Sequence, residues 1–198
     1  MAATTGKREQ TKAANRDAIL DAAREVFSEM GFGAASVRDI VRGTDLATGT
    51  FYNYFPDKES VLRALIEAAA SEIRVEVRAA RRAAQTLEDF VASGFRAYFE
   101  HLASDRQLFE LMQRNAGTIR VMFDQPAVGA GTDELTEDLR AGIAAGMIPD
   151  VDAEYLSRAM VGAAFEIAVL MLDREPIDVD GAVNFVTAMI LGGIDRLR

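Results

Sequence analysis

The most distinctive chemistry of this sequence lies in a short run of small polar and aromatic side chains. The small residues come first and the aromatic residues follow: Thr48, Gly49, Thr50, Phe51, Tyr52, Tyr54 and Phe55. Pro56 ends the run, because proline cannot continue a helix and disfavours helical geometry in the residue before it. The run therefore predicts a helix of about two turns, too short to be stable without support from neighbouring elements.

The spacing of the aromatic residues divides this short helix into two faces. Phe51 and Phe55 are four positions apart and share one face, so we expect them to anchor the helix on its support. The side chains left for the outer face are Thr50, Tyr52, Asn53 and Tyr54. Small residues at the front of the helix let its backbone approach a partner closely. This combination is typical of the recognition helix of a helix-turn-helix, whose first residues reach DNA.

A second helix, from Val37 to about Gly43, is predicted just before the turn that leads to the short helix. Ser36 and Asp39 have the spacing of a capping box. Free N–H groups and the helix dipole favour an anion at such a terminus, so Ser36 and Arg38 suit a DNA phosphate, and Arg42 faces the same side. In the short helix Ala47 cannot act as a cap, and we expect Thr48 to take that role.

The segment GTFYNYFPDKE, from Gly49 to Glu59, resembles the signature of the TetR family of bacterial transcriptional repressors. The similarity runs from about Arg16 to about Leu65, roughly a quarter of the 198 residues. It implies that Tyr52 and Tyr54 contact phosphates or bases and that Lys58 binds phosphate. The predicted DNA-binding set is Ser36, Arg38, Arg42, Thr48, Gly49, Thr50, Tyr52, Asn53, Tyr54 and Lys58.

Composition excludes several classes of site. The chain has no cysteine and only one histidine, His101, so thiolate chemistry, cysteine-bound zinc and most Ser-His-Asp schemes are ruled out. We expect no enzyme activity, no catalytic residue, no metal and no cofactor. The first ten residues are polar and contain no signal peptide, which favours a cytoplasmic protein. The longest nearly apolar run, residues 160–172, contains Glu166 and is too short to span a bilayer, so it indicates a buried helix.

Charge is distributed unevenly along the chain. Residues 1–82 carry 13 Lys+Arg and 12 Asp+Glu, a net +1, whereas residues 83–198 carry 9 and 19, a net −10. An acidic rear part keeps that side of the molecule away from DNA.

The fold class predicted from these patterns is all-α, with about nine helices. Residues 1–56 form a three-helix DNA-binding domain and residues 57–198 a helical domain for ligand binding and dimerisation. A long helix is predicted from Asp57 to about Ala84, with a solvated basic end. Gln125 to Gly131 is predicted to be a loop, and Asp180 to start the last helix.

The rear domain carries aromatic and methionine residues that suit either a plain core or an adaptable apolar cavity. The TetR resemblance implies an inducer pocket, for which the candidate residues are Phe95, Tyr98, Phe99, Phe109, Met112, Arg114, Met122, Phe123 and Phe165. Arg114 would either hold a polar group of the ligand or only end its helix. Residues 109–118 are also similar to fatty-acid-responsive members of the family, which makes a long-chain acyl group or acyl-CoA the first candidate ligand, followed by an aromatic molecule.

The last two helices are apolar on more than one face, so they need burial on more than one side. The chain's own core accounts for one side. In the TetR family these helices form a four-helix bundle between two subunits, which implies a homodimer with Gly162, Phe165, Val169, Val186, Met189 and Ile190 at the interface.

The sequence thus favours a ligand-responsive DNA-binding regulator with operator DNA, a small apolar effector and a second copy of itself as partners. Two alternatives remain: a helical carrier or enzyme, and a helix-turn-helix module that acts only through proteins. The operator, the regulated genes, the ligand and the direction of regulation are not encoded in recognisable form.

Overall fold

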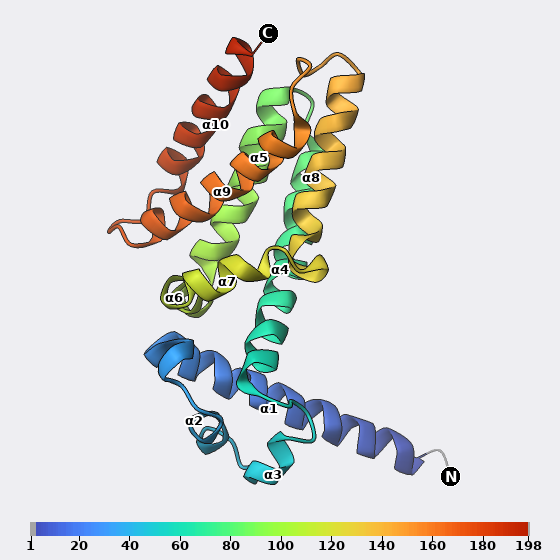
Figure 1. Ribbon diagram of the computed structural model, residues 1–198, viewed down its shortest axis with the longest axis vertical. Coiled ribbons are helices and arrows are strands. Elements are labelled where there is room, and N and C mark those ends of the chain that lie inside the picture. Colours follow the sequence, from blue (N-terminus) through green and yellow to red (C-terminus); the bar gives the residue numbers. More distant parts are fainter. Residues whose placement is uncertain (1–2, 198) are drawn as a thin grey trace. The chain divides into compact units, whose positions relative to one another are not determined.

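The computed structural model describes residues 3–197, with side chains from Arg8 onward. This part of the chain forms α-helices and contains no strand (Figure 1). The helices are α1 (Ala3–Ala34), α2 (Val37–Arg42), α3 (Thr48–Phe51), α4 (Lys58–Ala83), α5 (Leu87–Ser104), α6 (Arg106–Arg114), α7 (Ala116–Met122), α8 (Pro126–Ala144), α9 (Ala153–Leu172) and α10 (Val179–Arg196). The all-α class is confirmed.

The segment predicted to be a loop is helical, because α8 begins at Pro126. Proline at the first position of a helix loses no hydrogen bond, since the N–H it lacks would have had no partner there. Gly129 lies within this first turn, where a Cβ would come 2.7 Å from the carbonyl oxygen of Phe123. Gly129, which had indicated a loop, therefore lies inside a helix, where its lack of a side chain lets the backbone pass close to Phe123.

Another helix boundary differs from the prediction. α10 starts at Val179, because the side chain of Asp178 accepts a hydrogen bond from the N–H of Gly181 and caps the helix. α1 starts at Ala3 and includes most of the polar N-terminal residues. At its other end α1 breaks at Gly31, where φ is 78° and ψ 156°, a conformation that essentially only glycine adopts.

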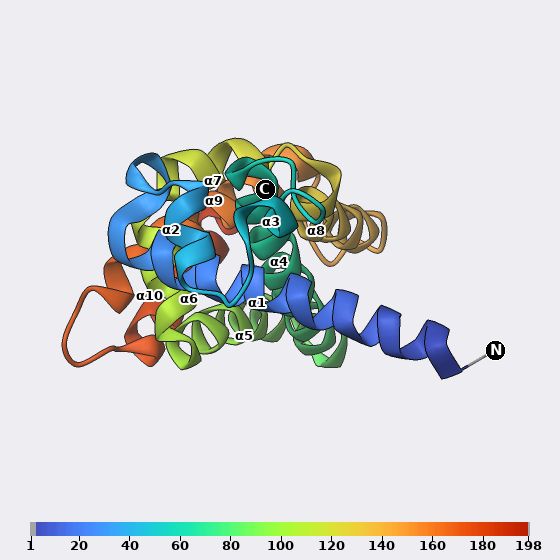
Figure 2. The same cartoon turned by 90° about the horizontal axis from the view of Figure 1, so that it is seen from below.

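The chain divides into two compact units. The N-terminal unit comprises Met1–Ala68 together with Glu110–Met122, and the C-terminal unit comprises Ala69–Phe109 together with Phe123–Arg198. The N-terminal unit therefore includes all of α7 and most of α6, a segment that lies well beyond position 56 in the sequence. Within this unit the N-terminal half of α1 extends beyond the short helices α2 and α3 (Figure 2).

The N-terminal unit has a continuous apolar core. α1 contributes a stripe of apolar side chains at three- and four-residue spacing, and α2, α3 and α4 contribute their inward faces. Among the side chains at most 8% exposed are Ile19, Ala22, Ala23, Phe27, Ile40, Val41, Phe51, Phe55, Val61 and Leu62. This core is the support that the short α3 requires.

In the C-terminal unit α10 packs along α5, α8 pairs with α9, and α9 also contacts α5 and α10. Apolar side chains from these four helices fill the space between them. Val91, Phe99, Leu102, Leu139, Val186 and Ile194 are at most 2% exposed.

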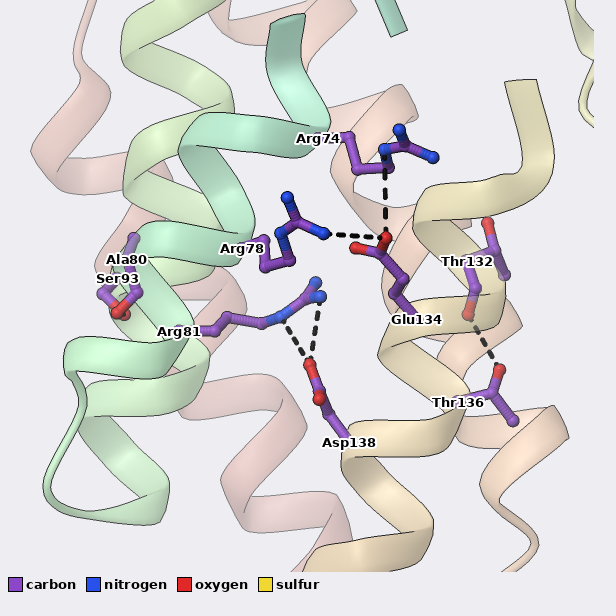
Figure 3. A network of polar contacts seen from close by, with 9 residues as sticks. All are labelled: Arg74, Arg78, Ala80, Arg81, Ser93, Thr132, Glu134, Thr136 and Asp138. Carbon is purple, nitrogen blue, oxygen red and sulfur yellow. Dashed lines mark hydrogen bonds and ion pairs between the residues drawn. The ribbon is translucent and has the colours of Figure 1, made fainter. Parts of the chain in front are cut away.

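An ion-pair network joins the basic end of α4 to α8 (Figure 3). Asp138 Oδ2 lies 3.1 Å from both Nε and Nη2 of Arg81, whose side chain is only 7% exposed. Glu134 Oε1 lies 3.4 Å from Arg78 Nη1 and 3.9 Å from Arg74 Nε. Burial lowers the pKa of Arg81, and the charges of Asp138 and Glu134 oppose that effect. The expectation that this basic segment is solvated is wrong for Arg81, which is buried, whereas Arg82 is exposed and Arg78 partly exposed. Arg78 and Arg81 meet carboxylates 56 and 57 residues further along the chain.

Asp138→Ala is expected to destabilise the protein by about 1–3 kcal/mol, because it leaves the buried Arg81 guanidinium without its main partner. Arg78→Ala is the control, since its side chain is 38% exposed and such a pair contributes about 0–1 kcal/mol. Urea unfolding measures both. If both variants lose the same free energy of unfolding, the buried ion pair of Arg81 contributes no more to stability than the partly exposed pair of Arg78.

Candidate nucleic-acid interface

The short helix α3 begins without a side-chain cap. Ala47 is its N-cap residue and makes no capping hydrogen bond, so Thr48 is the first helical residue and not the cap. The backbone N–H groups of Thr50 and Phe51 instead bond to the carbonyl oxygen of Ala47, at 2.8 and 3.3 Å. Beyond α3 the chain stays coiled, because the N–H groups of Tyr54 and Phe55 bond to the carbonyl oxygen of Phe51 at 2.9 and 3.1 Å.

The aromatic side chains hold α3 in place as the spacing predicts. Phe51 is fully buried and Phe55 is 5% exposed, with ring centroids 6.2 Å apart. Tyr52 packs edge-on against Phe51 at 5.4 Å while 55% of it remains exposed. Asn53 is exposed as well. The two faces are thus an apolar anchor and an outer surface with hydroxyl and amide groups.

Two residues of α1 support the other aromatic side chains, a role that was predicted for neither of them. Asn15 Nδ2 donates a hydrogen bond to the Tyr54 hydroxyl oxygen at 3.1 Å. The guanidinium of Arg16 lies 5.3 Å from the centroid of the Phe55 ring. Because the Tyr54 oxygen accepts from Asn15, its own proton is free to be donated to an acceptor such as a phosphate oxygen.

The capping box at the start of α2 is confirmed. Ser36 Oγ accepts from the N–H of Asp39 at 3.3 Å, and Asp39 Oδ2 accepts from the N–H of Ser36 at 3.0 Å. Hydrogen bonds from Ser36 lower the pKa of Asp39. Arg38 is exposed, and the side chain of Arg42 is 73% exposed and lies 3.6 Å from Asp39. These two arginines offer positive charge beside α3, since α2 packs against α3.

Lys58, the first residue of α4, contacts the backbone between α1 and α2. Its Nζ donates to the carbonyl oxygens of Phe32 and Ala35, at 2.7 and 2.8 Å, and lies 4.4 Å from the centroid of the Phe32 ring. An ammonium group has three donors, so one remains for other partners. Binding of phosphate by Lys58 stays a prediction. Its bonds to the backbone of Phe32 and Ala35 are a structural role that was not predicted.

The candidate ligand residues are divided between the two compact units. Phe95, Tyr98 and Phe99 lie together on α5, with centroids 5.9 Å apart for the two phenylalanines and 5.8 Å apart for Tyr98 and Phe99. Phe123 packs edge-on against Phe165 at 5.8 Å in the same unit, and Phe109 also belongs to it. Burial raises the pKa of Tyr98.

The remaining three candidates, Met112, Arg114 and Met122, belong to the N-terminal unit. Both methionines are 8% exposed and therefore buried, whereas Arg114 is exposed on α6. Helical periodicity identifies which side chains are apolar but not the unit in which they are buried.

The candidate dimer residues fall into two classes. Phe165, Val186 and Ile190 are 4%, 0% and 8% exposed and belong to the chain's own core, so they offer no surface to a partner. Their assignment is corrected. Gly162 and Met189 are exposed and Val169 is half-buried.

A different set of side chains forms the exposed face of α9 and α10. It comprises Tyr155 at 79%, Leu170 at 53%, Phe185 at 63% and Met189 at 46% exposure, together with Gly162, Glu166 and Gly192. We call it the α9–α10 face. On α9 its positions are seven, four and four residues apart, and on α10 four and three, so on each helix they lie along one face.

Among the described residues, α9 is also the one helix long and apolar enough to cross a membrane by length and composition. It is longer than the 13-residue run considered in the sequence analysis. One such helix is weak evidence, because the core helix of a soluble protein passes the same test.

The model of bacterial regulatory proteins of the tetR family matches residues 19–65, which contain α2, α3 and the start of α4. The HTH-type transcriptional regulator UidR of Escherichia coli strain K12 is 45% identical over 51 residues. That match covers 26% of this chain and 26% of the relative, about a quarter of each. The residues that the family model matches, 19–65, carry the candidate DNA contacts.

Similarity over the greater part of the chain is found with regulators of lipid metabolism. The fatty acid metabolism regulator protein of Bacillus subtilis strain 168 is 26% identical over 183 residues, 89% of this chain and 93% of the relative. The solved structure of the fatty acid degradation regulator FadR from Bacillus halodurans superposes with a TM-score of 0.78 at 25% identity, covering 90% and 95% of the two chains. FadR from Bacillus subtilis in complex with stearoyl-CoA superposes with a TM-score of 0.73 at 23% identity, covering 89% and 98%.

Proposed function

The chain belongs to the tetR family of bacterial regulatory proteins, and from that premise we propose that it is a cytoplasmic repressor that leaves a palindromic operator when a small apolar effector binds. The observation that carries the proposal is the construction of α3. Buried Phe51 and Phe55 fix a short helix whose outer side chains, Tyr52 and Asn53, are exposed inside the segment that matches the family.

The proposed DNA surface consists of α3 and the flanking basic residues. The first turn of α3 enters the major groove, where its small residues Thr48, Gly49 and Thr50 permit close approach to base edges. Tyr52, Asn53 and the free proton of Tyr54 bond to phosphates or bases. Arg38 and Arg42 bind phosphate on the α2 side, with Ser36 and Lys58 next to them. Residues 1–56 supply most of this domain, and residues 57–198 supply the ligand and dimer functions.

Capture and sequencing of genomic fragments bound by the purified protein tests this proposal and should recover a short palindrome. Arg38→Ala should weaken binding of that palindrome and reduce the slope of log affinity against log salt by about one. Arg174→Ala, an exposed arginine in the loop before α10, is the matched control and should leave the slope unchanged. Recovery of no DNA, or equal slopes for the two variants, would remove this assignment.

We propose that the second copy of the chain covers the α9–α10 face. Large exposed apolar side chains gathered on one surface indicate an interaction site. Gly162 and Gly192 face open space, because a Cβ at either position would meet nothing within 4 Å in the isolated chain. Since glycine has no side chain, a helix of the second copy can approach closely at these positions. A two-fold dimer presents two recognition helices to the two halves of a palindrome.

For the effector we propose a long-chain acyl group, free or as acyl-CoA. The phenylalanine clusters of the C-terminal unit suit a flexible hydrocarbon better than a sugar or nucleotide base. The Bacillus subtilis relative is named as a regulator of fatty acid metabolism, and a similarly folded FadR holds stearoyl-CoA, which supports the same class here. An aromatic effector is the alternative.

Stearoyl-CoA is expected to release the protein from the captured palindrome, as measured by fluorescence anisotropy. An affinity for the DNA-free state about 100-fold higher than for the bound state, near 2.7 kcal/mol, would give a usable switch. Coenzyme A without the acyl chain is the control and should not release the DNA. Release by coenzyme A or polar metabolites, but not by the acyl compound, would contradict the apolar class.

A further inference from the structure

Asn115 is the single residue between α6 and α7, and its side chain forms three hydrogen bonds in the N-terminal unit. Its Nδ2 donates to the carbonyl oxygens of Phe27 at 3.2 Å and Leu111 at 2.7 Å. Its Oδ1 accepts from the backbone N–H of Phe32 at 2.6 Å. The residue is 4% exposed, so both amide donors and the acceptor are satisfied within the protein.

The same peptide segment is held from its other side by Lys58. While Asn115 binds the N–H of Phe32, Lys58 Nζ binds the carbonyl oxygen of Phe32 and that of Ala35. The Phe32 ring lies under the ammonium and packs edge-on against Phe27 at 5.6 Å. We call residues 31–35, which include the last residues of α1, the α1–α2 connection. This connection is therefore held at both backbone polar groups of Phe32, the N–H and the carbonyl oxygen.

This connection determines where α2 begins. Gly31 breaks α1 with its positive φ of 78°, and Ser36 caps α2 five residues later. Ala35, whose carbonyl Lys58 holds, immediately precedes that cap. A change at Phe32 therefore alters the start of α2, which packs against α3.

From these contacts we infer that Asn115 is a positioning residue for DNA binding, which fixes the start of α2 through the N–H of Phe32. Asn115 lies 79 positions beyond Ser36 and offers no surface to DNA, since its side chain is buried. The inference rests on the proposed function for its DNA readout. Through Asn115 the α6–α7 segment also bonds directly to the DNA-binding helices. Phe109 and Phe123 flank this segment in the sequence.

Asn115→Leu tests this inference, because leucine has a similar volume without the amide. We expect faster hydrogen exchange at the N–H groups of Phe32 and the first turn of α2. The affinity of the folded fraction for the captured palindrome should fall at least about tenfold. Thr118→Ala, an exposed neighbour on α7, is the control and should match the wild type in both measurements.

Gly31→Ala disturbs the same connection from the α1 side and supports the test if Asn115→Leu folds poorly. A Cβ at Gly31 would have room, 3.9 Å from Asn115 Oδ1, so its effect would come from the backbone conformation alone. It should give the same exchange pattern and loss of affinity.

Unchanged α2 exchange, or unchanged operator affinity, in a folded variant of either kind would overturn the inference. A lower melting temperature with wild-type affinity would show a role in stability alone and would also overturn it. If the wild type captures no DNA, the proposed function fails, and the exchange experiment still decides whether Asn115 fixes α2.

Discussion

Phe185→Glu is expected to convert the protein to monomers and to lower its operator affinity by about 10³-fold or more. Phe185 is 63% exposed on α10, so the isolated chain tolerates the change, whereas a second copy would have to bury the new carboxylate. One half-site alone provides half of the contacts, and specific protein–DNA binding exceeds non-specific binding by about 10³–10⁷-fold. Analytical ultracentrifugation and anisotropy on the captured palindrome measure the two effects.

Val75→Glu is the matched control for this prediction. Val75 is 53% exposed on α4, outside the α9–α10 face, so the same change of side chain should leave the dimer and its DNA affinity intact. A dimeric Phe185→Glu variant would place the interface elsewhere. Monomers that keep full operator affinity would show that the second copy is not needed for DNA binding.

Much of the fold is encoded locally, which explains why it could be predicted. Caps at Ser36, Thr86 and Asp152 bond to N–H groups of the following turn, as their spacing indicates. Gly146, with φ at 71°, follows the end of α8, a position that favours glycine because its φ is positive. Such signals involve residues within four positions of one another.

The errors arise where one local signal has two structural meanings. Pro126 is compatible both with a loop and with the first residue of a helix. The close approach of Gly129 to Phe123 distinguishes the two, and it is visible only in the structure. An apolar residue such as Val186 is equally suited to the chain's own core and to a partner's surface. Periodicity gave the apolar stripes of α9 and α10, but the direction in which each stripe points depends on how α5 packs against them.

The candidate site shows the same division. The anchor role of Phe51 and Phe55 follows from their spacing, whereas the bond from Asn15 to Tyr54 joins positions 39 apart. The bonds from Asn115 to Phe27 and Phe32 span 88 and 83 positions. The sequence contains Asn115 as an ordinary polar residue between two short helices, and no local pattern distinguishes it from a helix-ending asparagine.

The two aromatic neighbours Phe51 and Tyr52 should respond in opposite ways to truncation. Phe51→Ala is expected to destabilise the protein by about 3–5 kcal/mol, because it removes a fully buried ring and leaves a cavity under a helix that has no side-chain cap. Tyr52→Ala should change stability by less than about 1 kcal/mol, since 55% of its surface is already exposed, and should weaken operator binding.

Urea unfolding and operator titration of both variants separate anchoring from recognition. Phe51→Leu is the control for Phe51→Ala, because leucine fills most of the cavity and should restore the larger part of the lost stability. The DNA affinity of the folded fraction should then also be close to that of the wild type, since Phe51 itself faces the core. If Tyr52→Ala binds the operator as tightly as the wild type, the exposed face of α3 is not the recognition surface, and the buried rings then support a helix with another partner.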